Sequence, residues 1–135
     1  MKIQKTMGWS GALVLALALH SGAAIARTAD LYDAPKVLSV SATPLDARQV
    51  RDRIVAGGQS QGWAVTREEP GLVELSYDKQ GKHQAAVVVR YDPSGYKIDY
   101  LSSFNLNYAE QDGVRKIHPN YNRWIQNLIK RIGPV

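Results

Sequence analysis

Two histidines, His83 and His118, are the side chains best suited to acid–base or metal chemistry in the part of the chain that follows residue 26. They stand 35 positions apart, and no His-x-His or His-Glu-x-x-His spacing places either beside another ligand. A metal site would need the fold to bring both rings to one carboxylate. The sequence favours a simpler interpretation, in which His83 is a solvated strand end and His118 starts a helix.

Nucleophilic catalysis has little support in the sequence. The chain has no cysteine, which excludes thiol chemistry, thiolate metal sites and disulfides. Ser102 and Ser103 follow Asp99, but no nucleophile-elbow glycine pattern surrounds them. Glu68 and Glu69 precede a turn and are adequately explained as solvated charge.

We therefore predict a non-enzymatic protein with no cofactor and no metal site. The alternative is a small hydrolase or metal-dependent enzyme that uses His118 with Asn120 or Asp112. Stoichiometric metal or turnover of cell-wall or ester substrates would favour the alternative.

The C-terminal third of the chain is rich in asparagine, and the amide side chain offers a donor and an acceptor together. Such groups suit carbohydrate or peptide recognition, but they also cap helices and satisfy loop backbone. The candidate binding face combines four asparagines with a tyrosine and a histidine: Asn105, Asn107, Tyr108, His118, Asn120 and Asn122. The competing interpretation is that these asparagines satisfy their own backbone.

Tyrosine and tryptophan are also frequent, and an exposed row of aromatic rings could stack on sugars. Most of these residues recur in phase with apolar positions, so we predict that they belong to the core, with Tyr108 as the exception. Trp124 lies in the middle of an apolar helical stripe, and we expect it to be a core residue.

The first 26 residues have the features of a secretory signal peptide. Two lysines precede an apolar run from Gly8 to Leu19, and Ala24-Ile25-Ala26 supplies small residues for cleavage before Arg27. A run of 12 residues is short for a transmembrane helix, which needs about 20. We predict export to the periplasm or beyond, with no transmembrane segment.

Removal of residues 1–26 takes two of the 17 basic residues and none of the acidic ones, which leaves 109 residues with 15 basic and 12 acidic side chains. A net charge of +3 falls short of a dedicated nucleic-acid binder, and we predict no nucleic-acid partner. It is compatible with weak attraction to anionic lipid or acidic polysaccharide. The predicted partner is an unidentified protein or envelope component, and the sequence does not indicate an oligomeric state.

The predicted mature chain has a flexible leader over residues 27–36 and a single α+β domain over residues 37–135. A helix is expected from an N-cap at Thr43 with Pro44 in the first turn, ending near Gly62. Four strands with alternating apolar and polar residues follow, at residues 63–67, 72–78, 83–91 and 96–101.

Residues 102–117 are expected to form a polar connection, and a loop of 16 residues in a compact domain is more often functional than idle. A last helix begins near His118-Pro119 and ends at Gly133. The predicted fold is a two-layer α+β sandwich. Its four-stranded antiparallel meander carries an N-terminal and a C-terminal helix on one face, with a possible extra edge strand near residues 36–42.

Two strings, Ser103-Phe-Asn-Leu-Asn-Tyr108 and Ile117-His-Pro-Asn-Tyr-Asn-Arg-Trp124, resemble an uncharacterised family of small exported proteins of Gram-negative bacteria. Many members of that family are described as lipoproteins, whereas this chain has no cysteine to carry lipid. The resemblance covers about residues 37–132. It implies one compact α+β domain in the cell envelope and assigns no catalytic residue.

Overall fold

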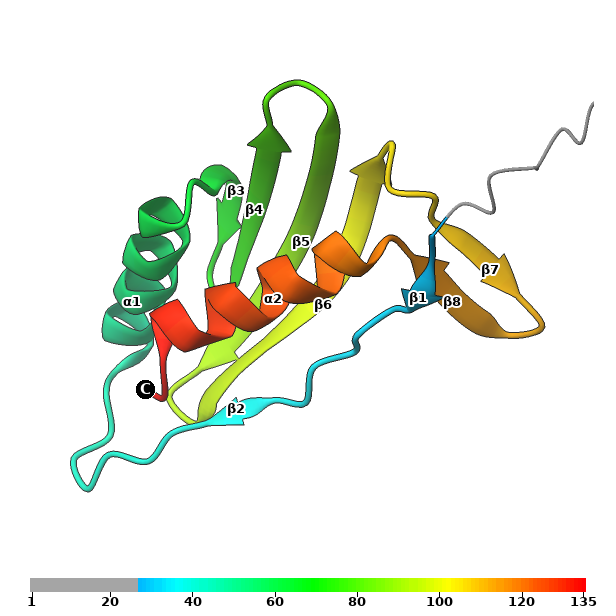
Figure 1. Cartoon of the computed structure of the whole chain (residues 1–135). Coiled ribbons are helices and arrows are strands. Elements are labelled where there is room, and N and C mark those ends of the chain that lie inside the picture. Colours follow the sequence, from blue (N-terminus) through cyan, green and yellow to red (C-terminus); the bar gives the residue numbers. More distant parts are fainter. Residues whose placement is uncertain (1–26) are drawn as a thin grey trace, which may run out of the picture.

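The computed structural model describes residues 27–135, and the predicted signal peptide lies outside them. The fold is α+β, with two helices, one five-stranded antiparallel sheet and one three-stranded antiparallel sheet (Figure 1). The helices are α1 (Ala47–Ser60) and α2 (Pro119–Ile132). The strands are β1 (Ala29–Asp30), β2 (Val37–Leu38), β3 (Ala64–Glu69), β4 (Leu72–Lys79), β5 (His83–Asp92), β6 (Gly95–Phe104), β7 (Ala109–Gln111) and β8 (Val114–Ile117).

The larger sheet has the strand order β2-β6-β5-β4-β3, so β3 to β6 are neighbours in both sequence and space. Apolar and polar residues alternate along its strands. Because successive side chains of a strand point to opposite faces, one face of the sheet is apolar and the other is charged. The outer face carries ion pairs between neighbouring strands, such as Arg67–Glu74 and Arg90–Asp99. The sheet has five strands rather than the four of the predicted meander, and the added strand β2 lies within the possible edge strand expected near residues 36–42.

Both helices pack on the apolar face of this sheet. Their apolar side chains share one buried cluster with the strands, as Ile54 of α1, Leu128 of α2 and Val87 of β5 illustrate. In Figure 1, α2 crosses in front of β4 to β6 and α1 lies beside it near β3. Gly57 allows close contact between the helices, since a Cβ atom there would lie 2.7 Å from Cγ1 of Ile132.

Helix α1 begins three residues later than the sequence predicted. Asp46, not Thr43, is the N-cap, and its carboxylate accepts the backbone N–H of Gln49 at 2.8 Å. The Gln49 side chain accepts the N–H of Asp46 in return, which completes a capping box. This reciprocal pair satisfies two free N–H groups of the helix terminus, whereas a Thr43 cap would satisfy one.

The predicted loop over residues 102–117 is largely a β-hairpin. Strand β6 continues to Phe104, and β7 and β8 pair across the two-residue turn Asp112-Gly113. Both turn residues have positive φ, 52° and 76°, as a type I′ turn requires. Asp-Gly is a strong hairpin signal, so the long polar connection was an incorrect interpretation of this segment.

The segment predicted to be a flexible leader lies along the domain. Strand β1 pairs with β8 through Ala29↔Ile117 and so completes the three-stranded sheet. Ala34 is buried in the core, and β2 then pairs with the start of β6. The backbone groups of this segment thus find partners that its irregular sequence does not indicate.

Neither helix within residues 27–135 is long and apolar enough to cross a membrane.

Candidate binding site

A hollow of about 310 Å³ opens between α2, the end of β4 and the segment that follows α1. Three aromatic rings form its floor. Tyr77 of β4 packs between Trp63, with ring centroids 5.4 Å apart, and Trp124 of α2, at 4.8 Å. Trp63 is buried, whereas Tyr77 and Trp124 are half-buried and reach the hollow. We call this feature the aromatic hollow.

The rim of the aromatic hollow is polar and comes from three elements. Its side chains are Gln61, Lys79, Asn120, Arg123 and Asn127. Within residues 27–135, none of these five side chains makes a hydrogen bond or an ion pair. Their donors and acceptors are therefore available to a ligand.

The α2 contribution follows from helical geometry. Asn120, Arg123 and Asn127 have the spacing i, i+3, i+7, which places them on one side of the helix. Trp124 lies next to this row and turns toward Tyr77. One surface of α2 thus supplies two amides, a guanidinium and an aromatic ring to the same hollow.

The electrostatic environment of the aromatic hollow is positive. Lys79 and Arg123 line it, and no carboxylate of the described chain does. The N-terminus of α2 begins beside Asn120 and adds the positive end of a helix dipole. At the same end of the molecule, burial and the nearby charges of His83, Arg27 and Arg123 lower the pKa of His118.

This arrangement can bind a ligand through charge and hydrogen bonds. The rim can hold an anion through Lys79 and Arg123, and its amides can pair with hydroxyl or carbonyl groups. Among the described residues that line the hollow there is no serine, histidine, aspartate or glutamate to act as nucleophile or general base.

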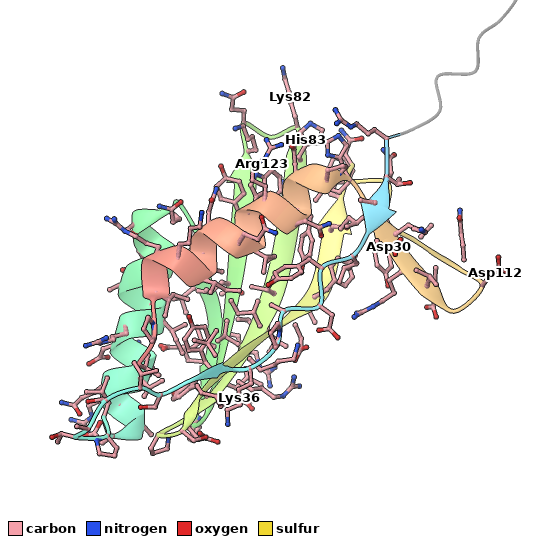
Figure 2. All side chains as sticks on the ribbon, turned by 60° about the horizontal axis from the view of Figure 1, so that its bottom comes forward. Asp30, Lys36, Lys82, His83, Asp112 and Arg123 are labelled. Atoms are coloured by element: carbon pink, nitrogen blue, oxygen red, sulfur yellow. The ribbon has the colours of Figure 1, made fainter. Side chains whose placement is uncertain are left out.

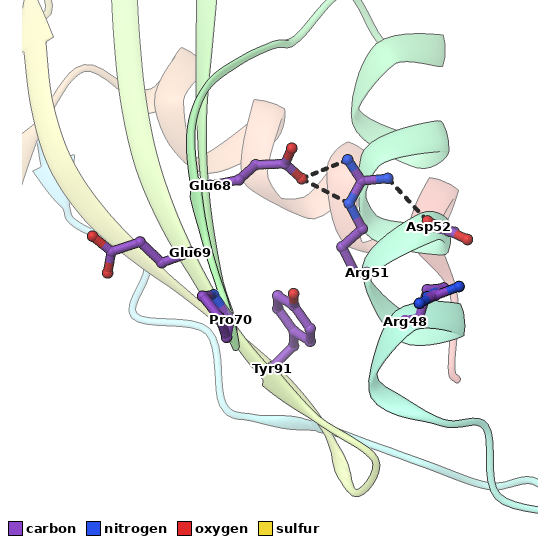
Figure 3. Close-up of a pocket in the computed structure, with 7 residues that line it drawn as sticks. All are labelled: Arg48, Arg51, Asp52, Glu68, Glu69, Pro70 and Tyr91. Carbon is purple, nitrogen blue, oxygen red and sulfur yellow. Dashed lines mark hydrogen bonds and ion pairs between the residues drawn. The ribbon is translucent and has the colours of Figure 1, made fainter.

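A second, wider hollow of about 500 Å³ lies between α1 and the β3–β4 turn (Figure 3). Apart from Arg48, its charged side chains are already paired. Arg51 contacts Glu68 at 2.6 Å and Asp52 at 2.9 Å, and Glu69 pairs with Arg67. A ligand there would have to displace these contacts, so the aromatic hollow is the better candidate site.

Two residues of the predicted binding face hold the fold together. Asn122 accepts the N–H of Tyr32 at 2.8 Å and donates to the carbonyl of Asp30 at 2.9 Å. Asn105 donates to the carbonyl of Lys82 at 2.8 Å and has a positive φ of 56°. These two asparagines satisfy backbone groups, in line with the alternative interpretation of the asparagine-rich segment.

The other members of the predicted face are dispersed. Tyr108 stacks on Tyr100 with ring centroids 4.3 Å apart, and Asn107 is exposed with a positive φ of 53°. His118 is the N-cap of α2, where its Nδ1 accepts the N–H of Asn120 at 3.1 Å. Only Asn120 of the six predicted residues lines the aromatic hollow.

The histidines lie closer together than the sequence suggests, with ring centroids of His83 and His118 6.3 Å apart. No group of three or more potential metal ligands forms within residues 27–135. Figure 2 shows His83 at one end of the molecule, together with Lys82 and Arg123, while Asp112 lies at the tip of the β7–β8 hairpin.

Sequence reasoning missed most of the hollow. No binding role was predicted for Arg123 or Asn127. The prediction that the tyrosines and tryptophans belong to the core holds for buried Trp63, whereas Tyr77 and Trp124 are half-buried and reach the hollow. The available signal was the i, i+3, i+7 spacing of Asn120, Arg123 and Asn127 directly beside Trp124. Gln61 and Lys79 carry no such signal, because only the tertiary fold brings them to α2.

No protein-family model, curated protein or solved structure matches this chain.

Proposed function

We propose that this chain is an exported, non-enzymatic binding domain of the cell envelope, and that its ligand carries negative charge and docks in the aromatic hollow. The observation that carries the proposal is the set of five polar side chains, two of them cationic, that surround an aromatic floor and have no hydrogen-bond or ion-pair partner within residues 27–135. Unpaired cations without a neighbouring carboxylate favour an anionic ligand.

The geometry of His118 argues against the hydrolase or metal-enzyme alternative. Because Nδ1 accepts the N–H of Asn120, the neutral ring carries its proton on Nε2. Neither nitrogen then has a free lone pair for a metal ion or for proton abstraction. Asp112, the carboxylate considered with it, lies on the distant hairpin tip (Figure 2).

Export is proposed from the sequence of residues 1–26. Arg27 and Thr28, which follow the proposed cleavage site, are exposed and precede the first paired residue of β1. Cleavage after Ala26 would therefore leave the paired strands of the domain intact. The resemblance to exported proteins of Gram-negative bacteria supports the same location. Intact mass of protein from the periplasmic fraction should correspond to a chain that begins at Arg27, and retention of residues 1–26 would contradict the proposal.

The hollow offers its own optical probe. Of the three tryptophans, Trp9 leaves with the proposed signal peptide, so Trp63 and Trp124 alone report on the site. Mature protein titrated with glucuronate or glycerol phosphate should show a saturable change of emission, and glucose should not.

Charge-neutralising variants locate the binding. Arg123→Gln should weaken anion binding by about tenfold, the effect of one charge-assisted hydrogen bond. Lys82→Gln is the matched control, since this lysine lies on the nearby β4–β5 turn outside the hollow and its replacement removes the same charge. Equal losses in both variants, or no saturable change with either anion, would refute the proposed site.

A further inference from the structure

We propose that the ligand is an extended acidic polysaccharide, bound along α2 in a groove of which the aromatic hollow is one half. This inference rests on the proposed function and specifies its ligand. It follows from a second hollow, from the distribution of charge along both, and from the kinds of side chain that lie between the charges.

The second hollow of this groove is distinct from the hollow beside the β3–β4 turn. It adjoins the aromatic hollow and has a volume of about 290 Å³. Gln61 and Asn127 line both hollows, so the two adjoin at these side chains. Lys130 and Arg131 complete the second hollow. Together the two hollows form a groove between α2 and the C-terminal end of α1, which we call the α2 groove.

The α2 groove is longer than a single sugar ring. Its α2 side is formed by Asn120, Arg123, Asn127 and Lys130, which follow the spacing i, i+3, i+7, i+10. Ten residues of α-helix span about 15 Å at 1.5 Å per residue. A monosaccharide would fill only one of the two hollows.

Positive charge recurs along the whole groove. Lys79 and Arg123 lie at one end and Lys130 and Arg131 at the other, and no carboxylate of the described chain lines either hollow. Arg131 donates through Nε to Ser60 Oγ at 2.8 Å, which fixes its guanidinium and leaves the terminal amino groups free. Cations at both ends match a polymer that carries a negative charge on successive units.

The side chains between the cations favour a carbohydrate over other anionic polymers. Gln61 and Asn127 lie midway, where amides can donate to and accept from sugar hydroxyls. Single-stranded nucleic acid is bound by a series of exposed aromatic platforms, but here Trp63 is buried and the second hollow has no aromatic residue. A bilayer surface is flat and cannot enter a concave groove.

The test uses mature protein and oligogalacturonates of one to six units, with neutral malto-oligosaccharides of equal length as controls, in isothermal titration calorimetry. Affinity should rise by about tenfold or more from the monomer to the oligomer that fills the groove, and then level off. Lys130→Gln should lower the affinity for the long oligomer about tenfold and should affect monomer binding less than oligomer binding. Arg123→Gln should weaken both.

Several outcomes would overturn the inference. If galacturonate binds but affinity does not increase with length, the proposed anion site stands and the extended groove is wrong. If neutral oligomers bind as tightly as acidic ones, charge does not select the ligand. Tighter binding of oligo-dT or of phosphatidylglycerol vesicles than of any oligogalacturonate would assign the groove to nucleic acid or to a membrane. Failure of every probe would overturn both proposals.

Discussion

Trp124 stands edge-on against Tyr77, with ring centroids 4.8 Å apart and an interplanar angle of 68°. The pair joins α2 to β4, and its exposed side is part of the floor of the aromatic hollow. Packing and the proposed binding therefore involve the same two rings. A change to either ring should affect stability as well as ligand contact.

Trp124→Ala should destabilise the domain by about 2 kcal/mol, less than the 3–5 kcal/mol typical of a fully buried tryptophan, because Trp124 is half-buried. Urea denaturation followed by circular dichroism measures this free energy of unfolding. Trp124→Phe keeps an aromatic edge against Tyr77 and should lower the free energy of unfolding by less than half as much as Trp124→Ala. Equal losses in the two variants would show that the ring contact contributes little.

Gly57→Ala should destabilise the domain, although alanine is favoured over glycine in a helix by about 1 kcal/mol. The added Cβ would lie 2.7 Å from Cγ1 of Ile132 and 3.0 Å from its backbone, so α2 would have to move away from α1. Thermal denaturation should show a lower melting temperature. Ile132→Ala makes room for the added Cβ. The double variant should therefore lose less stability than the sum of the two single losses.

The sheet and α2 could be predicted from the sequence because each follows a regular apolar period. Val73 and Leu75 of β4 are buried and alternate with partly exposed residues, and Tyr121, Ile125 and Leu128 recur at helical spacing, so burial confirms the pattern in these elements. The N-terminal segment could not be predicted in this way. This segment is held by individual hydrogen bonds, such as that from the N–H of Tyr32 to Asn122, and such contacts produce no periodic pattern in the sequence.

The candidate binding site could not be predicted from the sequence for a similar reason. Lys79 and Gln61 are separated from Arg123 by more than 40 residues, and only the packing of α2 over β4 gathers them. Asparagine content predicted a binding face that includes Asn122, and in the structure the side chain of Asn122 bonds to the backbone of Tyr32 and Asp30. A hydrogen-bonding side chain can serve backbone or ligand, and its type alone does not separate the two uses.

Asn122→Ala should release residues 29–32 from the domain while the rest stays folded. The substitution removes both side-chain bonds to Tyr32 and Asp30, and β1 is only two residues long. Hydrogen exchange at the amide of Tyr32 should accelerate, with little change in exchange within β5. Asn127→Ala on the same helix, whose amide has no partner in the described chain, should leave Tyr32 protected. Equal protection of Tyr32 in Asn122→Ala would show that β1 pairing alone holds this segment.

His118 links pH to stability through the cap of α2. Its neutral Nδ1 accepts the N–H of Asn120, and protonation would place a hydrogen there and end the bond. The groups that face it, His83, Arg27 and Arg123, all add positive charge when protonated. Burial and these charges therefore lower the pKa of His118 in the folded state relative to its ordinary value of about 6.5.

The sign of the pH effect follows from this lowered pKa. Between the folded pKa and about 6.5 the unfolded chain binds more protons than the native state, so the free energy of unfolding rises with pH in that window. The contribution of His118 should be complete above about pH 7.5 and lost as pH falls through the folded pKa. Urea denaturation from pH 5 to pH 8 measures the slope. His118→Asn keeps a favourable N-cap but cannot titrate, so its slope should be smaller than that of the native chain. A slope unchanged by this substitution would place the pH dependence on other groups.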